Sequence, residues 1–386
     1  MSFPLPHPHY FSYKINREVK EIYWHVVLNG IAFSLAYVFE PIYLYLLNYS
    51  LVQILWFYVA VYVGYAVLVS FGAKFASRFG YKHSILASSI MLVGYWACLY
   101  FIKDYPNLFF VAAIMFALQK SFYWPAFNAE MSLSAPNKQR GREVGVLFSL
   151  TEVAYIFGPF VGGLISYKFG FGALFASAAV LLLIAVYPLF RSADIYANHT
   201  FYFKNLLSIF LQRTRNFFGY FGYAEDLMLM SLWPIFIFIM VPEIFSVGAI
   251  LTSASILALF IMLYLGKLVD KAKHYNLLKL TALFYGLTWV FRFLAQSIPT
   301  VLAFDVLGKV GKGTVNVPMV SLTYGLAAGK GPEHAIAYAV FYEFSLSIGK
   351  IFTALLGIAI LSMGGSIFYV FILTGLLTML YGLLRK

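Results

Sequence analysis

Runs of mostly apolar residues, each about 20 to 30 residues long, follow one another along this chain from about residue 22 to about residue 384. Short segments that carry charges, Gly, Pro or Asn separate them. A helix needs about 20 such residues to cross the hydrocarbon core of a bilayer, because each residue advances the helix by about 1.5 Å. The runs therefore predict an all-α integral membrane protein with about twelve membrane-spanning helices.

The composition argues against a water-soluble alternative. Hydrophobic types make up 62% of the 386 residues and charged types only 11%. A soluble domain carries about 45–50% apolar and about 25% charged residues. So few charges do not cover a water-facing surface, and we expect lipid to cover much of it.

Lysine and arginine gather in every second connection between the runs. The basic connections include the groups Lys74, Arg78, Lys82; Lys138, Arg140, Arg142; and Arg191, Lys204, Arg213, Arg215. The alternate connections hold little more than Lys103 and Lys168. By the positive-inside rule this alternation predicts a cell-membrane protein with both termini in the cytoplasm. It also explains the net charge of +12 without nucleic-acid binding.

The longest interior connection, about residues 191–216, is polar and basic and lies near the middle of the chain. It predicts three parts. These are an N-terminal six-helix bundle with a short cytoplasmic tail (1–190), a cytoplasmic linker (191–216) and a C-terminal six-helix bundle (217–386).

The two halves share several features in the same order. A small residue and a basic turn follow both the second and the eighth span. The other matching pairs are Lys120 and Pro125 with Lys312 and Pro318, and Glu152 and Gly158 with Glu343 and Gly349. Such a series indicates a parallel internal repeat, related by an axis along the membrane normal.

The connection after the eighth span carries the most specific motif, Gly266-Lys-Leu-Val-Asp270-Lys271. It resembles a loop signature of the major facilitator superfamily. The first-half copy keeps Arg78 and Gly80 but has Ser77 where the signature has Asp. This departure moves the gating role that the resemblance implies toward the second-half loop.

A second motif in the fifth span, Gly158-Pro159-Phe-Val-Gly162-Gly163, is similar to a signature of exporters and antiporters in that family. Small residues let two helices approach closely and Pro kinks a helix, so tight packing is an equally good explanation. The resemblance extends over essentially the whole chain. It implies two pseudo-symmetric six-helix bundles around a central cavity that opens alternately to either side of the membrane.

Ionisable residues inside the apolar runs are numerous for such a chain, and a charge at the bilayer centre costs about 2.5–3.5 kcal/mol. In the family arrangement the first, fourth, seventh and tenth spans line the cavity. This makes the following residues candidates for the substrate cavity: Lys120, Trp124, Glu225, Asp226, Asp305, Lys309 and Lys312. The candidates for proton coupling are Glu152, Glu225, Asp226 and Glu343.

The alternative explanation of these intramembrane charges is a set of static ion pairs that hold helices together, which we favour for Arg292 with Asp305. Near the end of the first span, we expect Glu40 to reach the interface by snorkelling.

Taken together, these features predict a secondary active transporter of a small solute, working by alternating access and by proton-coupled export. A facilitated uniporter of the same fold, or a membrane-embedded lipid-handling protein or enzyme, are the alternatives. We expect no enzymatic activity, no cofactor and no metal, because the chain has no phosphate-binding loop and no metal-ligand spacing. The expected partners are a small-molecule solute, a proton or another coupling ion, and membrane lipids, with the protein acting as a monomer.

Overall fold

The computed structural model describes residues 17–134, 140–191, 202–269 and 274–385. Within these ranges, side chains are described except at 17–20, 132–134, 140–149, 151–152, 263–269, 274–277, 330 and 332. All regular secondary structure in the described ranges is helical.

The first half of the chain forms six α-helices and one short 3₁₀ turn. They are α1 (Arg17–Ala36), α2 (Phe39–Leu46), α3 (Leu51–Phe79), α4 (Tyr81–Phe101), α5 (Leu108–Ser134), α6 (Arg140–Val186) and η1 (Tyr187–Arg191). The predicted fifth and sixth spans, 143–167 and 171–190, are joined in α6. The helix turns back at Gly170, whose φ of 80° is open to glycine at little cost.

The second half begins with a short helix that the sequence did not predict, α7 (Phe203–Gln212). It continues with α8 (Thr214–Tyr220), η2 (Phe221–Ala224), α9 (Glu225–Met230), α10 (Leu232–Met240), α11 (Ile244–Val269), α12 (His274–Val290) and η3 (Phe291–Leu294). It ends with α13 (Ile298–Ala327), η4 (Ala328–Lys330), α14 (Pro332–Ser362), α15 (Ile367–Thr378) and η5 (Met379–Leu383).

Local sequence explains several helix ends. Ser50 and Gln53 form a reciprocal capping box at the start of α3, and Ser297 and Thr300 form another at the start of α13. Gly80, with a φ of 100°, makes the sharp turn from α3 into α4.

The seventh predicted span is interrupted, and this matters for the site. Between α9 and α10 the backbone leaves helical geometry at Ser231, where Pro234 cannot donate a hydrogen bond to the preceding turn. Glu225 and Asp226 lie at the other end of α9, where it follows the 3₁₀ segment η2.

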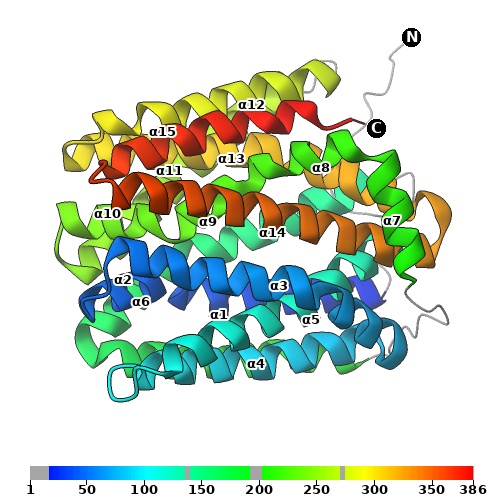
Figure 1. Ribbon diagram of the computed structural model, residues 1–386, viewed down its shortest axis with the longest axis horizontal. Coiled ribbons are helices and arrows are strands. Elements are labelled where there is room, and N and C mark those ends of the chain that lie inside the picture. Colours follow the sequence, from blue (N-terminus) through cyan, green and yellow to red (C-terminus); the bar gives the residue numbers. More distant parts are fainter. Residues whose placement is uncertain (1–16, 135–139, 192–201, 270–273, 386) are drawn as a thin grey trace, which may run out of the picture.

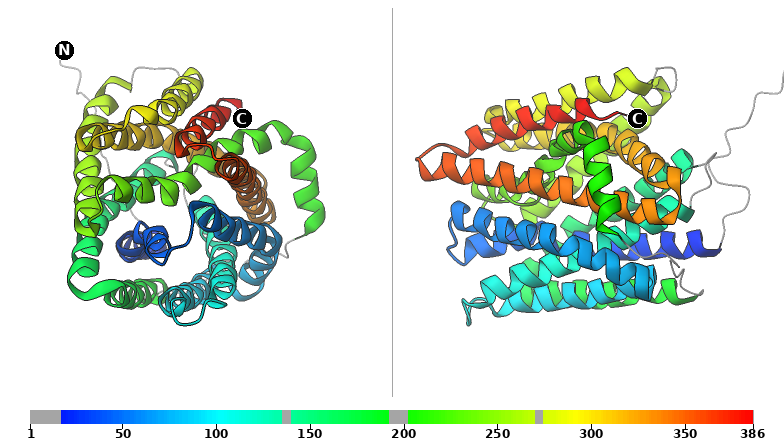
Figure 2. Two further views of the ribbon diagram at one scale, coloured as in Figure 1. Left: turned by 60° about the vertical axis from the view of Figure 1, so that its left-hand side comes forward. Right: turned by 45° about the vertical axis from the view of Figure 1, so that its right-hand side comes forward.

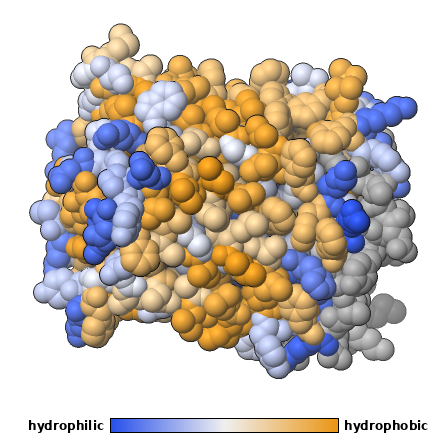
Figure 3. Space-filling model, turned by 60° about the horizontal axis from the view of Figure 1, so that its bottom comes forward, coloured by the Kyte–Doolittle hydropathy of each residue, from blue (hydrophilic) through white to orange (hydrophobic). Residues whose placement is uncertain are grey.

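The surface and the helix lengths are those of a multi-pass membrane protein. In the described ranges, eight helical stretches are long and apolar enough to cross a bilayer, and Ile367–Leu383 is a shorter apolar helix. One of the eight, Val153–Arg191, contains the reversal at Gly170. Figure 3 shows an apolar band between two hydrophilic rims. The helices are consistent with the expected count of about twelve.

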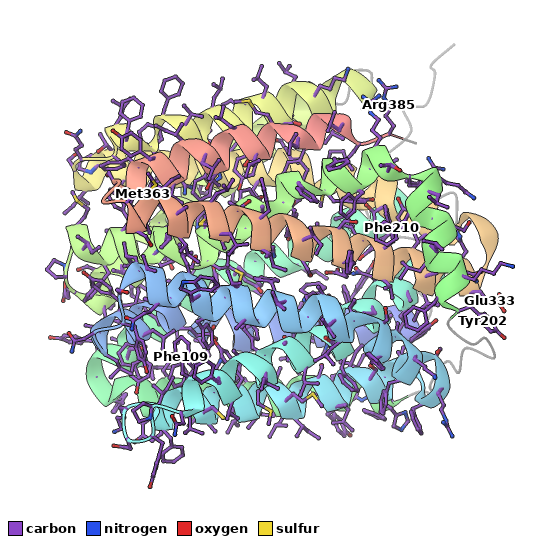
Figure 4. All side chains as sticks on the ribbon, viewed as in Figure 1. Phe109, Tyr202, Phe210, Glu333, Met363 and Arg385 are labelled. Atoms are coloured by element: carbon purple, nitrogen blue, oxygen red, sulfur yellow. The ribbon has the colours of Figure 1, made fainter. Side chains whose placement is uncertain are left out.

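The helices run roughly side by side, with α3 and α4 below and α12 and α15 above in Figure 1. Helix α7 and the C-terminus lie at one end of the molecule, called here the linker end, and the α2–α3 turn lies at the far end. Figure 4 places Tyr202, Phe210 and Glu333 at the linker end and Met363 and Phe109 toward the far end. The two halves meet where α3 packs on α14 and α6 packs on α11.

Candidate functional site

A cavity of about 200 Å³ lies between the two halves. Helices α1, α3, α4, α5 and α6 supply one wall, and α9, α13 and α14, with Tyr223 from η2, supply the other. Its charged lining residues are Lys120, Asp226, Glu343 and Lys350. Its aromatic lining residues are Phe33, Tyr62, Tyr65, Tyr123, Trp124, Phe127, Tyr155, Tyr223, Tyr324 and Tyr342. The cavity is therefore rich in aromatic side chains, with a few charges placed within it.

Asp226 is the centre of an ion cluster in the second half. Lys350 Nζ lies 2.8 Å from Asp226 Oδ2, and Lys312 contacts Asp226 Oδ1. Lys350 also donates a hydrogen bond of 3.1 Å to the hydroxyl of Tyr62, which lies on α3 in the first half. Because two ammonium groups already hold Asp226, this cluster is internally satisfied.

Glu225, next in sequence to Asp226, faces away from the cavity wall. Its Oε1 accepts a hydrogen bond of 3.2 Å from the Tyr381 hydroxyl and lies 3.9 Å from Lys312 Nζ. Adjacent residues on a helix point about 100° apart, so one of the two acids faces the cavity and the other packs within the C-terminal half.

Glu343 joins the two halves directly. On α14, it accepts a hydrogen bond of 2.9 Å from the Tyr65 hydroxyl of α3 and one of 2.7 Å from the Asn128 side chain of α5. Asn128 in turn accepts a hydrogen bond of 2.9 Å from Tyr324 of α13. The network alternates between the halves, and Glu343 is its only ionisable carboxylate.

Lys120 projects from α5 into the cavity, where its charge interacts with Glu40 and Glu343 without a direct ion pair among the described residues. Its Nζ lies 4.3 Å from the Phe116 ring centroid and 5.4 Å from that of Tyr62. Within the described part of the chain it has no hydrogen-bond acceptor and no carboxylate within 4 Å. Its three N–H donors are therefore available to a ligand.

Asp305 and Lys309, expected among the cavity residues, pair with each other at 3.1 Å and are not part of this cavity wall. The indole of Trp233 donates to Asp305 Oδ1 at 2.9 Å. The prediction of an ion pair between Arg292 and Asp305 is wrong. The Arg292 guanidinium instead lies between the rings of Trp233 and Trp289, at 3.9 and 3.5 Å from their centroids.

The expectation for Glu40 is also wrong. Glu40 does not reach the interface, because it is fully buried and accepts hydrogen bonds from the Tyr95 hydroxyl at 3.0 Å and the Trp96 indole at 2.7 Å. The indole and phenol donors replace the water that snorkelling would have supplied.

The Gly-Pro motif of α6 has two packing faces. A Cβ at Gly158 or Gly162 would lie about 2 Å from α1, at 1.9 Å from Ser34 Oγ and 2.2 Å from the Leu35 carbonyl oxygen respectively. Gly163 and the Pro159 carbonyl face α11 instead, across the boundary between the halves. The motif thus brings α6 close to two helices at once.

The remaining predicted residues divide into two groups. Arg78 and Gly80 end α3, with the Arg78 guanidinium 5.4 Å from the Phe79 ring centroid. Asp270 and Lys271 lie outside the described residues, and the same holds for the side chain of Glu152 and the surroundings of Gly266.

Sequence reasoning gave no specific role to Lys350, Asn128, Tyr62 or Tyr65, which the structure brings into the cavity. Lys350 was visible as one more charge inside an apolar run. Neutral Asn and Tyr side chains carry no such signal, because lipid-facing and cavity-facing tyrosines look alike in a sequence.

Similarity to known transporters agrees with this architecture. The family model "Major Facilitator Superfamily" matches residues 23–238, more than half of the chain. A Na(+), Li(+), K(+)/H(+) antiporter of Planococcus maritimus is 29% identical over 121 residues. That alignment covers 30% of this chain and 28% of the antiporter, so the chain matches less than a third of that relative's length.

Solved structures resemble the whole chain. The POT family transporter PepTSo superposes with a TM-score of 0.71 at 13% identity, covering 96% of this chain and 97% of that one. The Escherichia coli fucose:proton symporter gives 0.67 at 14% identity, covering 94% and 96%. At such identities the likeness shows the fold alone. Fold, cavity and family model agree, and the chain belongs to the Major Facilitator Superfamily.

Proposed function

We propose that this protein is a proton-coupled exporter that exchanges a small organic solute for a proton by alternating access to the central cavity. The observation that carries the proposal is Glu343, a carboxylate on α14 whose two hydrogen-bond donors, Tyr65 and Asn128, belong to the other half.

Protonation of Glu343 changes this contact between the halves. An ionised carboxylate only accepts hydrogen bonds, whereas a protonated one also carries a donor. Hydrogen bonds to a charged group are roughly twice as strong as neutral ones. A proton on Glu343 therefore weakens two links between the halves and shifts the balance between the two access states.

The matched segment of the antiporter supports exchange against protons as the mode of transport. Asp226 is poorly suited to bind an alkali cation, because Lys312 and Lys350 already hold its oxygens. Among the described residues no group of three His, Cys, Asp or Glu side chains is placed to hold a metal ion. We therefore propose an organic solute.

We propose that the linker end faces the cytoplasm of a cell membrane, because two of the basic segments, the α3–α4 turn and helix α7, lie at that end. In this orientation residues 1–190 and 217–386 are the two moving bodies, 191–216 is the linker, and the chain works as a monomer. The outward direction rests on the Gly158-Pro159 motif and on the antiporter relative.

Proteoliposomes with an internal pH dye test this function. With an acidic lumen, addition of a transported solute outside should release protons from the lumen. We would add in turn NaCl, LiCl, KCl, aromatic amino acids, aromatic carboxylates and aromatic amines. The wild type should respond to an organic class, and Glu343→Gln should lose the response while the same substitution at exposed Glu333 on α14 leaves it intact. Solute flux that ignores the pH gradient in both proteins would establish a uniporter instead.

A further inference from the structure

Lys120 and Glu343 face the cavity from opposite halves, and both have unused bonding capacity. Lys120 has three N–H donors and touches only ring faces. A carboxylate has about four acceptor positions, and Glu343 uses two of them. Each side chain is therefore able to bind a ligand group of opposite charge without giving up its present contacts.

The two charges are close enough for one small molecule to reach both. The Lys120 ammonium lies over Tyr62, and Glu343 accepts from Tyr65. Tyr62 and Tyr65 are three residues apart on α3, which is about 4.5 Å along a helix and on the same face. The positive and the negative group therefore lie beside neighbouring residues on one face of α3, and their charges interact with each other.

The other charges in the cavity are not available in this way. Lys350 and Lys312 both bind Asp226, and Lys350 also donates to Tyr62. A ligand that bound any of them would first have to break an ion pair in a partly buried place. The Lys120–Glu343 pair is the less costly site.

The rest of the wall favours a flat apolar body. Tyr123 and Phe127 stack at 5.4 Å between centroids, and Trp124 meets Tyr123 edge-on at 5.1 Å. Aromatic rings bind other rings well in offset or edge-on arrangements. The cavity of about 200 Å³ is smaller than the clefts of about 300–1,000 Å³ that hold drug-sized ligands, which favours a single ring.

We propose that the solute is a small zwitterion with a single aromatic ring. Its carboxylate binds Lys120, its ammonium binds Glu343, and its ring packs among Tyr123, Trp124 and Phe127. The inference rests on the proposed function and deepens it. Because the ammonium and the proton compete for Glu343, binding the solute releases the proton, which is the step that exchange requires.

The test is binding to purified full-length protein in detergent, without any gradient. Four probes separate the charges from the ring: phenylalanine, 3-phenylpropanoate (no ammonium), 2-phenylethylamine (no carboxylate) and glycine (no ring). We expect phenylalanine to bind at least about tenfold more tightly than each of the other three. Equal binding of 3-phenylpropanoate or of 2-phenylethylamine, or no binding of phenylalanine, overturns the proposal.

Variants then assign each end of the ligand. In Lys120→Gln, phenylalanine should bind no better than 2-phenylethylamine, whose affinity stays unchanged. Lys120→Arg keeps the charge and should retain the preference, which distinguishes a lost contact from a misfolded protein. Lys103→Gln, the same change in an exposed connection, should bind like the wild type. If Lys120→Gln also keeps the preference, Lys120 is not the carboxylate site.

The outcome is separable from that of the proposed function. Binding of phenylalanine without proton release in proteoliposomes would keep the ligand class and reject proton exchange. Proton release driven by another solute class, without phenylalanine binding, would keep proton exchange and reject the proposed ligand class.

Discussion

Thr252 of α11 donates its hydroxyl hydrogen to the carbonyl oxygen of Ile156 in α6 at 2.8 Å. The same hydroxyl accepts the Phe160 N–H at 3.2 Å. Ile156 and Phe160 are the pair that an unbroken helix joins directly, and Pro159 lies between them. A side chain from the opposite half thus binds the backbone of α6 on both sides of Pro159.

Thr252→Val should loosen this contact between α6 and α11. Valine has the same shape but no hydroxyl, which costs about 1 kcal/mol or more, or about a fivefold change in an equilibrium. A cysteine at Ile244, in a Cys98→Ser background without other thiols, should then react faster with a membrane-impermeant maleimide. Thr252→Ser keeps the hydroxyl and should label like the parent. Equal rates in all three proteins would show that the hydroxyl does not hold the halves together.

Asp226→Asn should destabilise the protein strongly. The change leaves the Lys312 and Lys350 ammonium groups without their shared counter-charge in a partly buried site. Breaking such a cluster on one side costs about 3 kcal/mol. The denaturation midpoint in detergent should fall, and it should recover when Lys350 is also replaced by Met, because Lys312 keeps Glu225 as its counter-charge. Asp104→Asn in the exposed segment 103–107 is the matched control, and a midpoint equal to the control would contradict the cluster's role.

Gly158→Ala should impair folding, whereas Gly325→Ala should not. An added methyl at Gly158 collides with Ser34 of α1, while nothing lies within 4 Å of one at Gly325. Overpacking of this kind costs about 1–3 kcal/mol. Expression level and monodispersity on size exclusion give the comparison. Two equally well-behaved variants would mean that α1 can shift away from α6.

Arg292→Met should leave stability unchanged or raise it. Arg292 is fully buried and stacked between two indoles, and its guanidinium nitrogens have no hydrogen-bond partner among the described residues. Asp305 keeps Lys309 as its counter-ion in the variant. Burying a charge without a hydrogen-bond partner carries a desolvation cost, which an apolar side chain of similar volume removes. A clear fall in the denaturation midpoint would reveal an interaction that stacking alone does not describe.

The fold was largely predictable from the sequence, because the length of an apolar run and the alternation of basic connections are imposed by the bilayer itself. The reversal at Gly170 falls between the fifth and sixth predicted spans, 143–167 and 171–190, because one apolar run ends there and the next begins. Helix α7 was missed, because ten residues that are apolar on one side and polar on the other do not stand out inside a basic linker.

The site was predicted less completely. A charged residue inside an apolar run is easily recognised in a sequence, which is why Lys120, Asp226 and Glu343 were candidates. Its partner depends on packing between helices far apart in the chain, and the Glu343 donors lie 278 and 215 residues away. For the same reason the expected ion pair between Arg292 and Asp305 was wrong. Arg292 stacks on indole rings, and Asp305 pairs with Lys309.

Helix α7 lies across the linker end and packs on α14, where Phe210 meets the rings of Phe341 and Phe344 edge-on at 4.9 and 5.5 Å. Its opposite side is open, with Leu211 77% exposed. Because the helix is fastened to α14, a fluorophore at Leu211 travels with that half of the molecule. Paired with a second dye at exposed His83 on α4, it gives a distance that reports the proposed movement of one half against the other, measured on single molecules and without altering the cavity.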